Sequence, residues 1–136
     1  MLTRLAIVDL TNNDILLPVS FLEDFRKNNS QKVAMVYSNQ SKTIHFFSLR
    51  NGTDWILKIQ IEFFPPIRSS NVTKLLEILK ERFDRIVFST GICNYEDDCL
   101  WEGYATNHLL PDLEVVKQEL SEVPELKKIE LNIQEA

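Results

Sequence analysis

The chain has 136 residues and a formal net charge of −5, with 44% hydrophobic and 26% charged residues. These values are typical of a globular protein of one ordinary domain or two very small ones, and they exclude collagen-like and low-complexity chains. The apolar runs are far too short to span a membrane, and Asp9 and the segment 12–14 interrupt any secretory signal. We therefore expect a soluble, cytoplasmic protein with no membrane contact.

The charge is divided unevenly along the chain. Residues 1–50 hold six Lys/Arg and four Asp/Glu, whereas residues 51–136 hold nine Lys/Arg and sixteen Asp/Glu. Such a division suggests two modules, and any binding of a polyanion belongs to the first. Asn51–Gly52 is the clearest turn signal between them, so we predict modules over 1–50 and 54–136.

The residue pattern of the first module predicts three strands and one short helix. Ser20, with Glu23 three residues later, has the spacing of a helix capping box, which places Ser20 at the helix start. Pro18 ends the apolar run before it. The predicted strands cover 5–8, 33–37 and 44–49.

The residue pattern of the second module predicts strands and helices in the order β-α-β-β-α-β. Hydrophobic and polar residues alternate over 57–63, as in a strand with one buried face. Ser69, Ser70 and Asn71 are candidate caps for a helix with apolar residues at helical spacing up to Phe83. Pro111–Asp112 introduces a second helix. The remaining strands are predicted around 86–88, 100–106 and 129–133, and the whole order favours an α+β, ferredoxin-like sandwich.

The first fifty residues resemble a degenerate AbrB/MazE-type swapped-hairpin domain. The resemblance rests on the turn 12–14, the aliphatic run ending in Pro18, the short helix with Phe21 and Phe25, and the two strands after it. It implies a dimer that binds DNA. Asn13–Asp14 and Leu22–Glu23 stand where the family commonly has turn and arginine residues, so a module that only dimerises is the alternative. The basic residues left to contact DNA are Arg4, Arg26, Lys27 and Lys32.

The second module resembles an ACT-type regulatory domain, through its topology. ACT domains often bind amino acids beside the loop from the first strand to the first helix, which here covers 64–71 and lacks the family's usual glycine. The resemblance implies binding of an amino-acid-like or anionic effector, because a helix N-terminus attracts anions. The predicted ligand-binding residues are Arg68, Ser69, Ser70 and Asn71. Simple helix capping beside an exposed arginine is the alternative.

Two cysteines flank an acidic segment between two predicted strands. Cys93 and Cys99 are compatible with a disulfide across a hairpin, with two reduced thiols, or with a metal site that also uses Asp97, Asp98 or His108. The acids raise a thiol's pKa, so we expect these cysteines to be structural.

No catalytic motif is found, and no cofactor or metal is predicted. His45 lies among aromatic residues of a predicted strand, where we expect it to be packed. The sequence therefore predicts a non-enzymatic regulatory protein, a transcriptional regulator in which an effector alters dimer geometry. A homodimer is expected because the first module is too small to bury its apolar residues, among them Leu16, Phe21, Phe25, Phe46 and Phe47. The alternatives are a protein-interaction subunit that does not bind DNA and a redox protein that uses Cys93 and Cys99.

Overall fold

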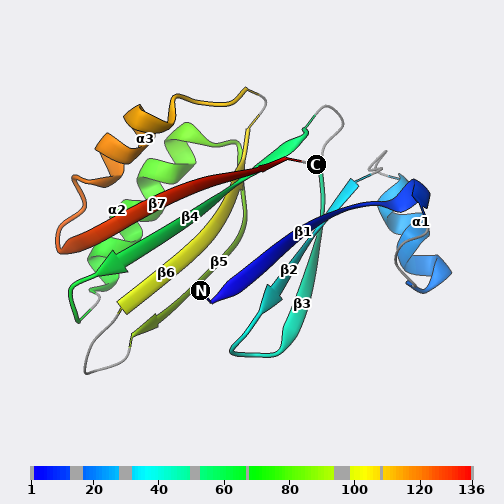
Figure 1. The fold of residues 1–136 in the computed structure, drawn as a ribbon, viewed down its shortest axis with the longest axis horizontal. Helices are drawn as coiled ribbons and strands as arrows, with labels where there is room; N and C mark the ends of the chain where they lie inside the picture. Colours follow the sequence, from blue (N-terminus) through cyan, green and yellow to red (C-terminus); the bar gives the residue numbers. More distant parts are fainter. Residues whose placement is uncertain are drawn as a thin grey trace. The chain divides into compact units, whose positions relative to one another are not determined.

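The computed structural model describes residues 2–12, 17–27, 32–49, 53–66, 68–93, 99–107 and 109–135. Within these residues the chain is a mixed α+β protein with seven strands in two antiparallel sheets and three α-helices (Figure 1). It divides into an N-terminal unit, Met1–Asp54 with Glu135–Ala136, and a C-terminal unit, Trp55–Gln134. The boundary predicted at Asn51–Gly52 lies outside the described residues.

The N-terminal unit is built on a three-stranded antiparallel sheet in the order β1-β2-β3. The strands pair within one chain, with Leu5 opposite Val36 and Met35 opposite Phe46. A 3-10 turn follows β1, and one helix precedes β2. The elements are β1 (Thr3–Asp9), η1 (Leu10–Asn12), α1 (Val19–Lys27), β2 (Lys32–Ser38) and β3 (Thr43–Ser48).

Helix α1 begins two residues earlier than a Ser20 cap predicts. Its first residue is Val19, and the Pro18 carbonyl accepts hydrogen bonds from the backbone N–H groups of Phe21 and Leu22. The prediction that Ser20 caps this helix is therefore wrong, because Ser20 lies inside the first turn. None of the nine side chains of α1 is buried, and Phe21 is 56% exposed.

Both faces of the N-terminal sheet are apolar. Neighbouring residues of a strand point to opposite faces, yet Val33 and Ala34 are both fully buried in β2. Ile44, on β3, is half exposed. Val33 and Ala34 are therefore already covered within one chain, and the homodimer expected from the sequence stays a prediction.

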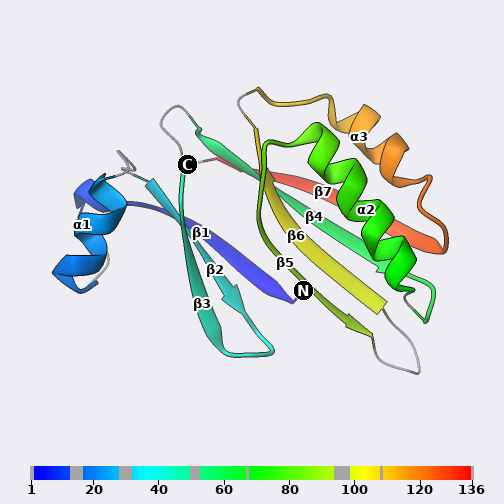
Figure 2. The same cartoon turned by 180° about the vertical axis from the view of Figure 1, so that it is seen from behind.

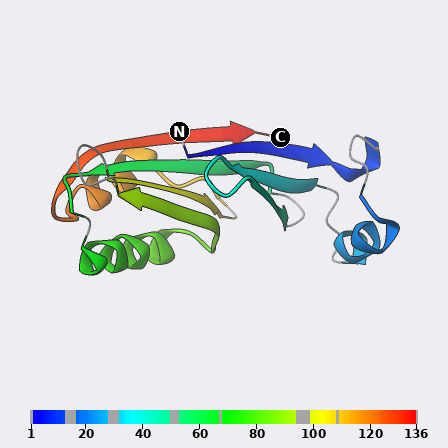
Figure 3. The ribbon, with the colours of Figure 1, turned by 90° about the horizontal axis from the view of Figure 1, so that it is seen from below.

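The C-terminal unit is a four-stranded sheet in the order β5-β6-β4-β7. Helices α2 and α3 lie on the same side of it (Figures 2 and 3). The predicted succession of strands and helices in this part is therefore present. The elements are β4 (Trp55–Phe63), α2 (Ser69–Arg82), β5 (Arg85–Cys93), β6 (Cys99–Thr106), α3 (Leu113–Leu120) and β7 (Leu126–Glu135).

The core of this unit fills the space between the two helices and one face of the sheet. Leu57, Ile59 and Ile61 alternate along β4 and contribute to one cluster with residues of both helices. The helical members of the cluster are Leu75 and Leu79 of α2 and Val116 and Leu120 of α3. Phe63 ends the β4 series at 1% exposed, whereas the next residue, Phe64, is 54% exposed. Phe64 lies outside the core because β4 ends at Phe63.

The starts of α2 and α3 differ. Pro111–Asp112 precedes α3 as predicted, and Asp112 caps the helix: its carboxylate accepts a hydrogen bond from the Glu114 backbone N–H at 3.0 Å. Helix α2 starts at Ser69 with Arg68 at the N-cap, which has no side-chain capping bond. Ser69, Ser70 and Asn71 are therefore first-turn residues and not the caps the sequence suggests.

Gly103 provides a direct test of this packing. A Cβ atom built there would overlap Cη2 of the buried Trp101 ring, so Gly103→Ala forces the indole to move. We expect a loss of about 1–3 kcal/mol in the free energy of unfolding, measured by urea titration. The control is Gly91→Ala, whose added Cβ meets its nearest atom at an ordinary 3.4 Å. Equal stability of the two variants would contradict the packing of Trp101 over Gly103.

Candidate functional site

The predicted effector site lies at the N-terminus of α2. Arg68, Ser69 and Ser70 are exposed there, while Asn71 is only 5% exposed. The backbone N–H groups of Asn71 and Val72 donate to the Arg68 carbonyl, as expected of a first turn without a side-chain cap. The structure therefore brings the four predicted residues together at one helix end.

Glu125 supplies a carboxylate to this helix end, although no sequence motif indicates it. One carboxylate oxygen lies 3.4 Å from Nε of Arg68, and the other accepts a long hydrogen bond from Nδ2 of Asn71 at 3.5 Å. The Glu125 backbone carbonyl also accepts a bond from the Phe64 N–H at 2.8 Å. The residue just before β7 thus reaches back to the residue after β4 and to the start of α2.

The backbone of Glu125 is in the left-handed region, at φ 65°. A residue with a Cβ pays roughly 1 kcal/mol for this conformation, so surrounding contacts must hold it. Its carboxylate meets the positive end of the α2 dipole and the Arg68 guanidinium together. The start of α2 therefore already binds a carboxylate. In this structure that carboxylate belongs to Glu125 of the same chain.

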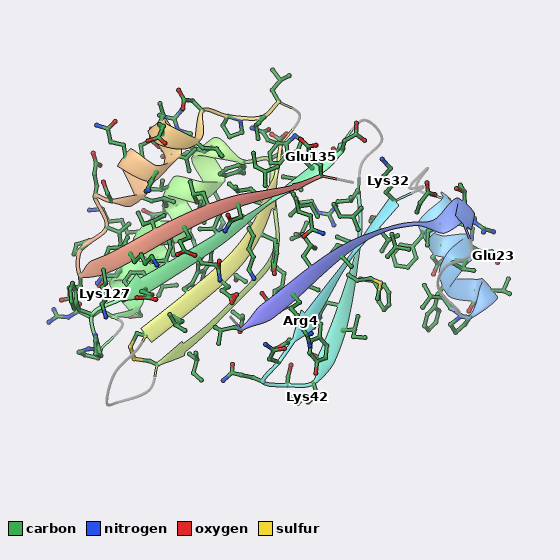
Figure 4. All side chains as sticks on the ribbon, viewed as in Figure 1. Arg4, Glu23, Lys32, Lys42, Lys127 and Glu135 are labelled. Carbon is green, nitrogen blue, oxygen red and sulfur yellow. A yellow bond between two sulfur atoms is a disulfide. The ribbon has the colours of Figure 1, made fainter. Side chains whose placement is uncertain are left out.

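The four basic residues predicted to contact DNA do not form one cluster. Arg4 is opposite Tyr37 in the ladder and packs over its ring at 4.9 Å, while Lys32 is opposite Asp9 at the other end of β2. The two positions lie five residue steps apart along the strand, roughly 17 Å, and their side chains point to opposite faces of the sheet. Figure 4 shows Arg4 and Lys32 apart on this unit.

Arg26 and Lys27 are the basic pair with the clearest exposure. Both lie in the last turn of α1, where positive charge also complements the helix dipole. Lys32 is instead engaged in an ion pair with Asp54 at 3.2 Å. The end of α1 is therefore the part of the predicted basic face most available to a polyanion.

Cys93 and Cys99 are cross-strand neighbours at the ends of β5 and β6. They face each other in the ladder with a Cα–Cα distance of 4.0 Å, and their sulfur atoms are joined in a disulfide. Cys99 is buried and Cys93 exposed. Asp97, Asp98 and His108, the other ligands of the predicted metal alternative, lie outside the described residues.

A polar cluster on the sheet face away from the helices escaped the sequence analysis. Lys58 and Glu102 form an ion pair at 3.1 Å, with side chains only 13% and 3% exposed. Gln60 donates to the same Glu102 oxygen at 3.5 Å, and the Lys58 ammonium lies 5.8 Å from the Tyr104 ring. The alternation along β4 placed Lys58 on this face, but only the β4–β6 register reveals its partner. Loss of Glu102 would remove a carboxylate that lies beside a nearly buried ammonium, so this pair favours the observed register of the two strands.

His45 differs from its prediction. It is exposed on β3, and its Nε2 lies 3.2 Å from the Thr43 hydroxyl. The described residues contain no group of three or more His, Cys, Asp or Glu side chains that could hold a metal ion.

In the part of the chain that the structure describes, no helix has the length and apolar character required to cross a bilayer.

No protein-family model matches the chain, and no protein with a curated function matches it at a significant level.

The disulfide has a measurable consequence. We expect the double variant Cys93→Ser/Cys99→Ser to lose about 2 kcal/mol of unfolding free energy, because a short closed loop removes only limited chain entropy. Chemical denaturation with and without reductant measures the change, and reductant should lower the stability of the wild type alone. Oligomeric state and ligand binding should stay as in wild type, since both cysteines serve the hairpin. Loss of binding in this variant would instead place the functional centre at this hairpin.

Proposed function

We propose that the protein is a non-enzymatic regulatory protein. In this proposal the C-terminal unit is an ACT-like sensor of a small carboxylate or other anion, and the N-terminal unit is an AbrB-like output module that contacts DNA. The observation that carries it is the Glu125 carboxylate held by Arg68 and Asn71 at the start of α2.

The order of the elements supports the two resemblances. A β-α-β-β-α-β chain whose sheet runs β5-β6-β4-β7, with both helices on one face, is the arrangement that a ferredoxin-like sandwich requires. The order strand, turn, short helix, strand, strand in the N-terminal unit agrees with an AbrB-like half. Fold alone does not assign function, so the proposal depends on the α2 site.

The proposed mechanism is an exchange of carboxylates. An effector carboxylate takes the place of Glu125 beside Arg68 and the α2 N-terminus, and Glu125 is released from its left-handed conformation. Because Glu125 directly precedes β7, its release changes how that strand begins. The effector shifts the protein between two states because it binds only the state in which Glu125 has left.

Two substitutions with opposite effects test the sensor. Arg68→Ala removes the cation and should weaken effector binding about tenfold or more. Glu125→Gln removes the competing negative charge and should tighten it. Calorimetric titration with the twenty amino acids and with inorganic phosphate measures both. Lys74→Ala, an exposed cation farther along α2, is the matched control and should bind as wild type. Absence of binding by every probe, or equal losses in both variants, would contradict the exchange.

DNA binding is tested at the end of α1. In a dimer, Arg26→Ala/Lys27→Ala removes up to four phosphate contacts, so the slope of log K against log[salt] should decrease by about 3–4. Affinity should fall together for all DNA sequences, because phosphate contacts carry no base information. Fluorescence anisotropy over a salt series measures this, with Lys74→Ala/Lys80→Ala as a control of equal charge. A wild-type protein that binds no DNA at low salt would contradict the output role.

Exposed apolar residues of α1 favour a second candidate for the N-terminal unit. Val19 is 70% exposed on this helix, whose side chains are nowhere buried. A short amphipathic helix of this kind suits a protein partner that receives its apolar face. Under this candidate the sensor is retained, and the output is a protein contact in place of DNA.

A further inference from the structure

Strand β7 is an edge of the C-terminal sheet. It is ten residues long, and among the described strands its only neighbour is β4. The outer side of an edge strand presents backbone N–H and C=O groups that can pair with another strand. A long edge is therefore a natural place for strand addition.

The two faces of β7 have different chemistry. Ile129, Leu131 and Ile133 pack against the core below the helices. On the other face Lys128 and Glu130 form an ion pair at 2.7 Å, and the hydrogen bond from Lys128 holds the pKa of Glu130 below its ordinary value. Lys127 and Glu135 share the face of the isoleucines and lie at opposite ends of the strand (Figure 4).

A groove of about 310 Å³ runs between β7 and α3. Leu113 of α3 and Ile129 and Leu131 of β7 give it an apolar lining, and Glu114 and Lys117 add charges from the helix. A strand added outside β7 would place its own alternate side chains beside these residues. The groove therefore suits a strand with apolar residues at every second position.

We propose that two copies of this chain pair through β7, antiparallel, about a two-fold axis at Leu131. Leu131 then faces its own copy, and Ile129 faces Ile133 of the second copy twice. Lys127 faces Glu135 at both ends, an attraction that directly opposite charges on one face provide. The strand is thus complementary to itself, as an isologous interface requires.

Neighbouring registers lose this complementarity. A two-fold axis at Glu130 places two glutamates opposite each other and Lys127 opposite Ile133. An axis at Asn132 places Ile129 opposite Glu135. If one strand instead slides by a single residue along the other, the two faces are exchanged. Apolar side chains of one copy then lie opposite polar side chains of the other. The charges of β7 therefore select one register.

This dimer deepens the proposed regulatory function, on which its role rests, by naming the partner as a second copy. In this dimer, effector binding at α2 also influences the pairing of the two copies, because Glu125 immediately precedes the pairing strand β7. The dimer itself is measured without effector or DNA. Failure of the dimer and failure of the sensor are therefore separate outcomes.

Charge exchange on the full chain tests the interface. Lys127→Glu places glutamates opposite each other at both ends and should weaken the dimer about tenfold, and Glu135→Lys should do the same with lysines. The double variant Lys127→Glu/Glu135→Lys restores both attractions and should recover the wild-type dissociation constant. Sedimentation equilibrium over a concentration series measures it. Lys80→Glu and Glu81→Lys, exposed on α2, are the matched controls and should change nothing.

Crosslinking tests the register. In the background Cys93→Ser/Cys99→Ser, a mixture of the Glu130→Cys and Asn132→Cys variants should form an intermolecular disulfide faster than either variant alone, because residues 130 and 132 face each other across the axis. A monomeric wild type at micromolar concentration would overturn the proposal. So would a dimer indifferent to the charge exchange, or one without preference for the mixed crosslink.

Discussion

The alternation of apolar and polar residues along strand β4 is the constraint on which the C-terminal unit depends. This strand is central, and its neighbours β6 and β7 flank it on either side. Leu57, Ile59 and Ile61 face the two helices and hold the core, while Lys58 and Gln60 face the other way and meet Glu102. A slip of one residue would exchange these faces, burying a lysine among leucines and exposing the apolar series. The same few residues therefore set the core, the ion pair and the strand register.

Local sequence signals predicted most of the elements but not their exact starts. The alternation over 57–63 and the helical spacing up to Phe83 each reflect a single face, and the structure has both. Ser20 and Ser69 have the chemistry of caps, yet both lie inside a helix, because Pro18 and Arg68 provide the carbonyls that begin the first turns. Capping propensity marks the neighbourhood of a helix start and leaves its position open by one or two residues.

Long-range partners are the part that the sequence could not provide. Glu125 follows Arg68 by fifty-seven positions, and Glu102 follows Lys58 by forty-four. No periodicity connects such residues, because each pair depends on which strands become neighbours and in which register. The cysteine pair was accessible because a hairpin relates residues close in sequence. Half of the candidate site could therefore be predicted from the sequence. Arg68 and the start of α2 could be inferred, but the carboxylate of Glu125 could not.

The covalent link between Cys93 and Cys99 changes what a break in the chain would mean. The sulfur bond and the ladder between β5 and β6 both bridge the interval 94–98. A peptide bond cut within that interval would leave two fragments that still migrate as one molecule until a reductant is added. Strands β5 and β6 are therefore joined both by the disulfide and by their backbone hydrogen bonds. New chain ends placed in this interval would leave every strand of the sheet attached to the others.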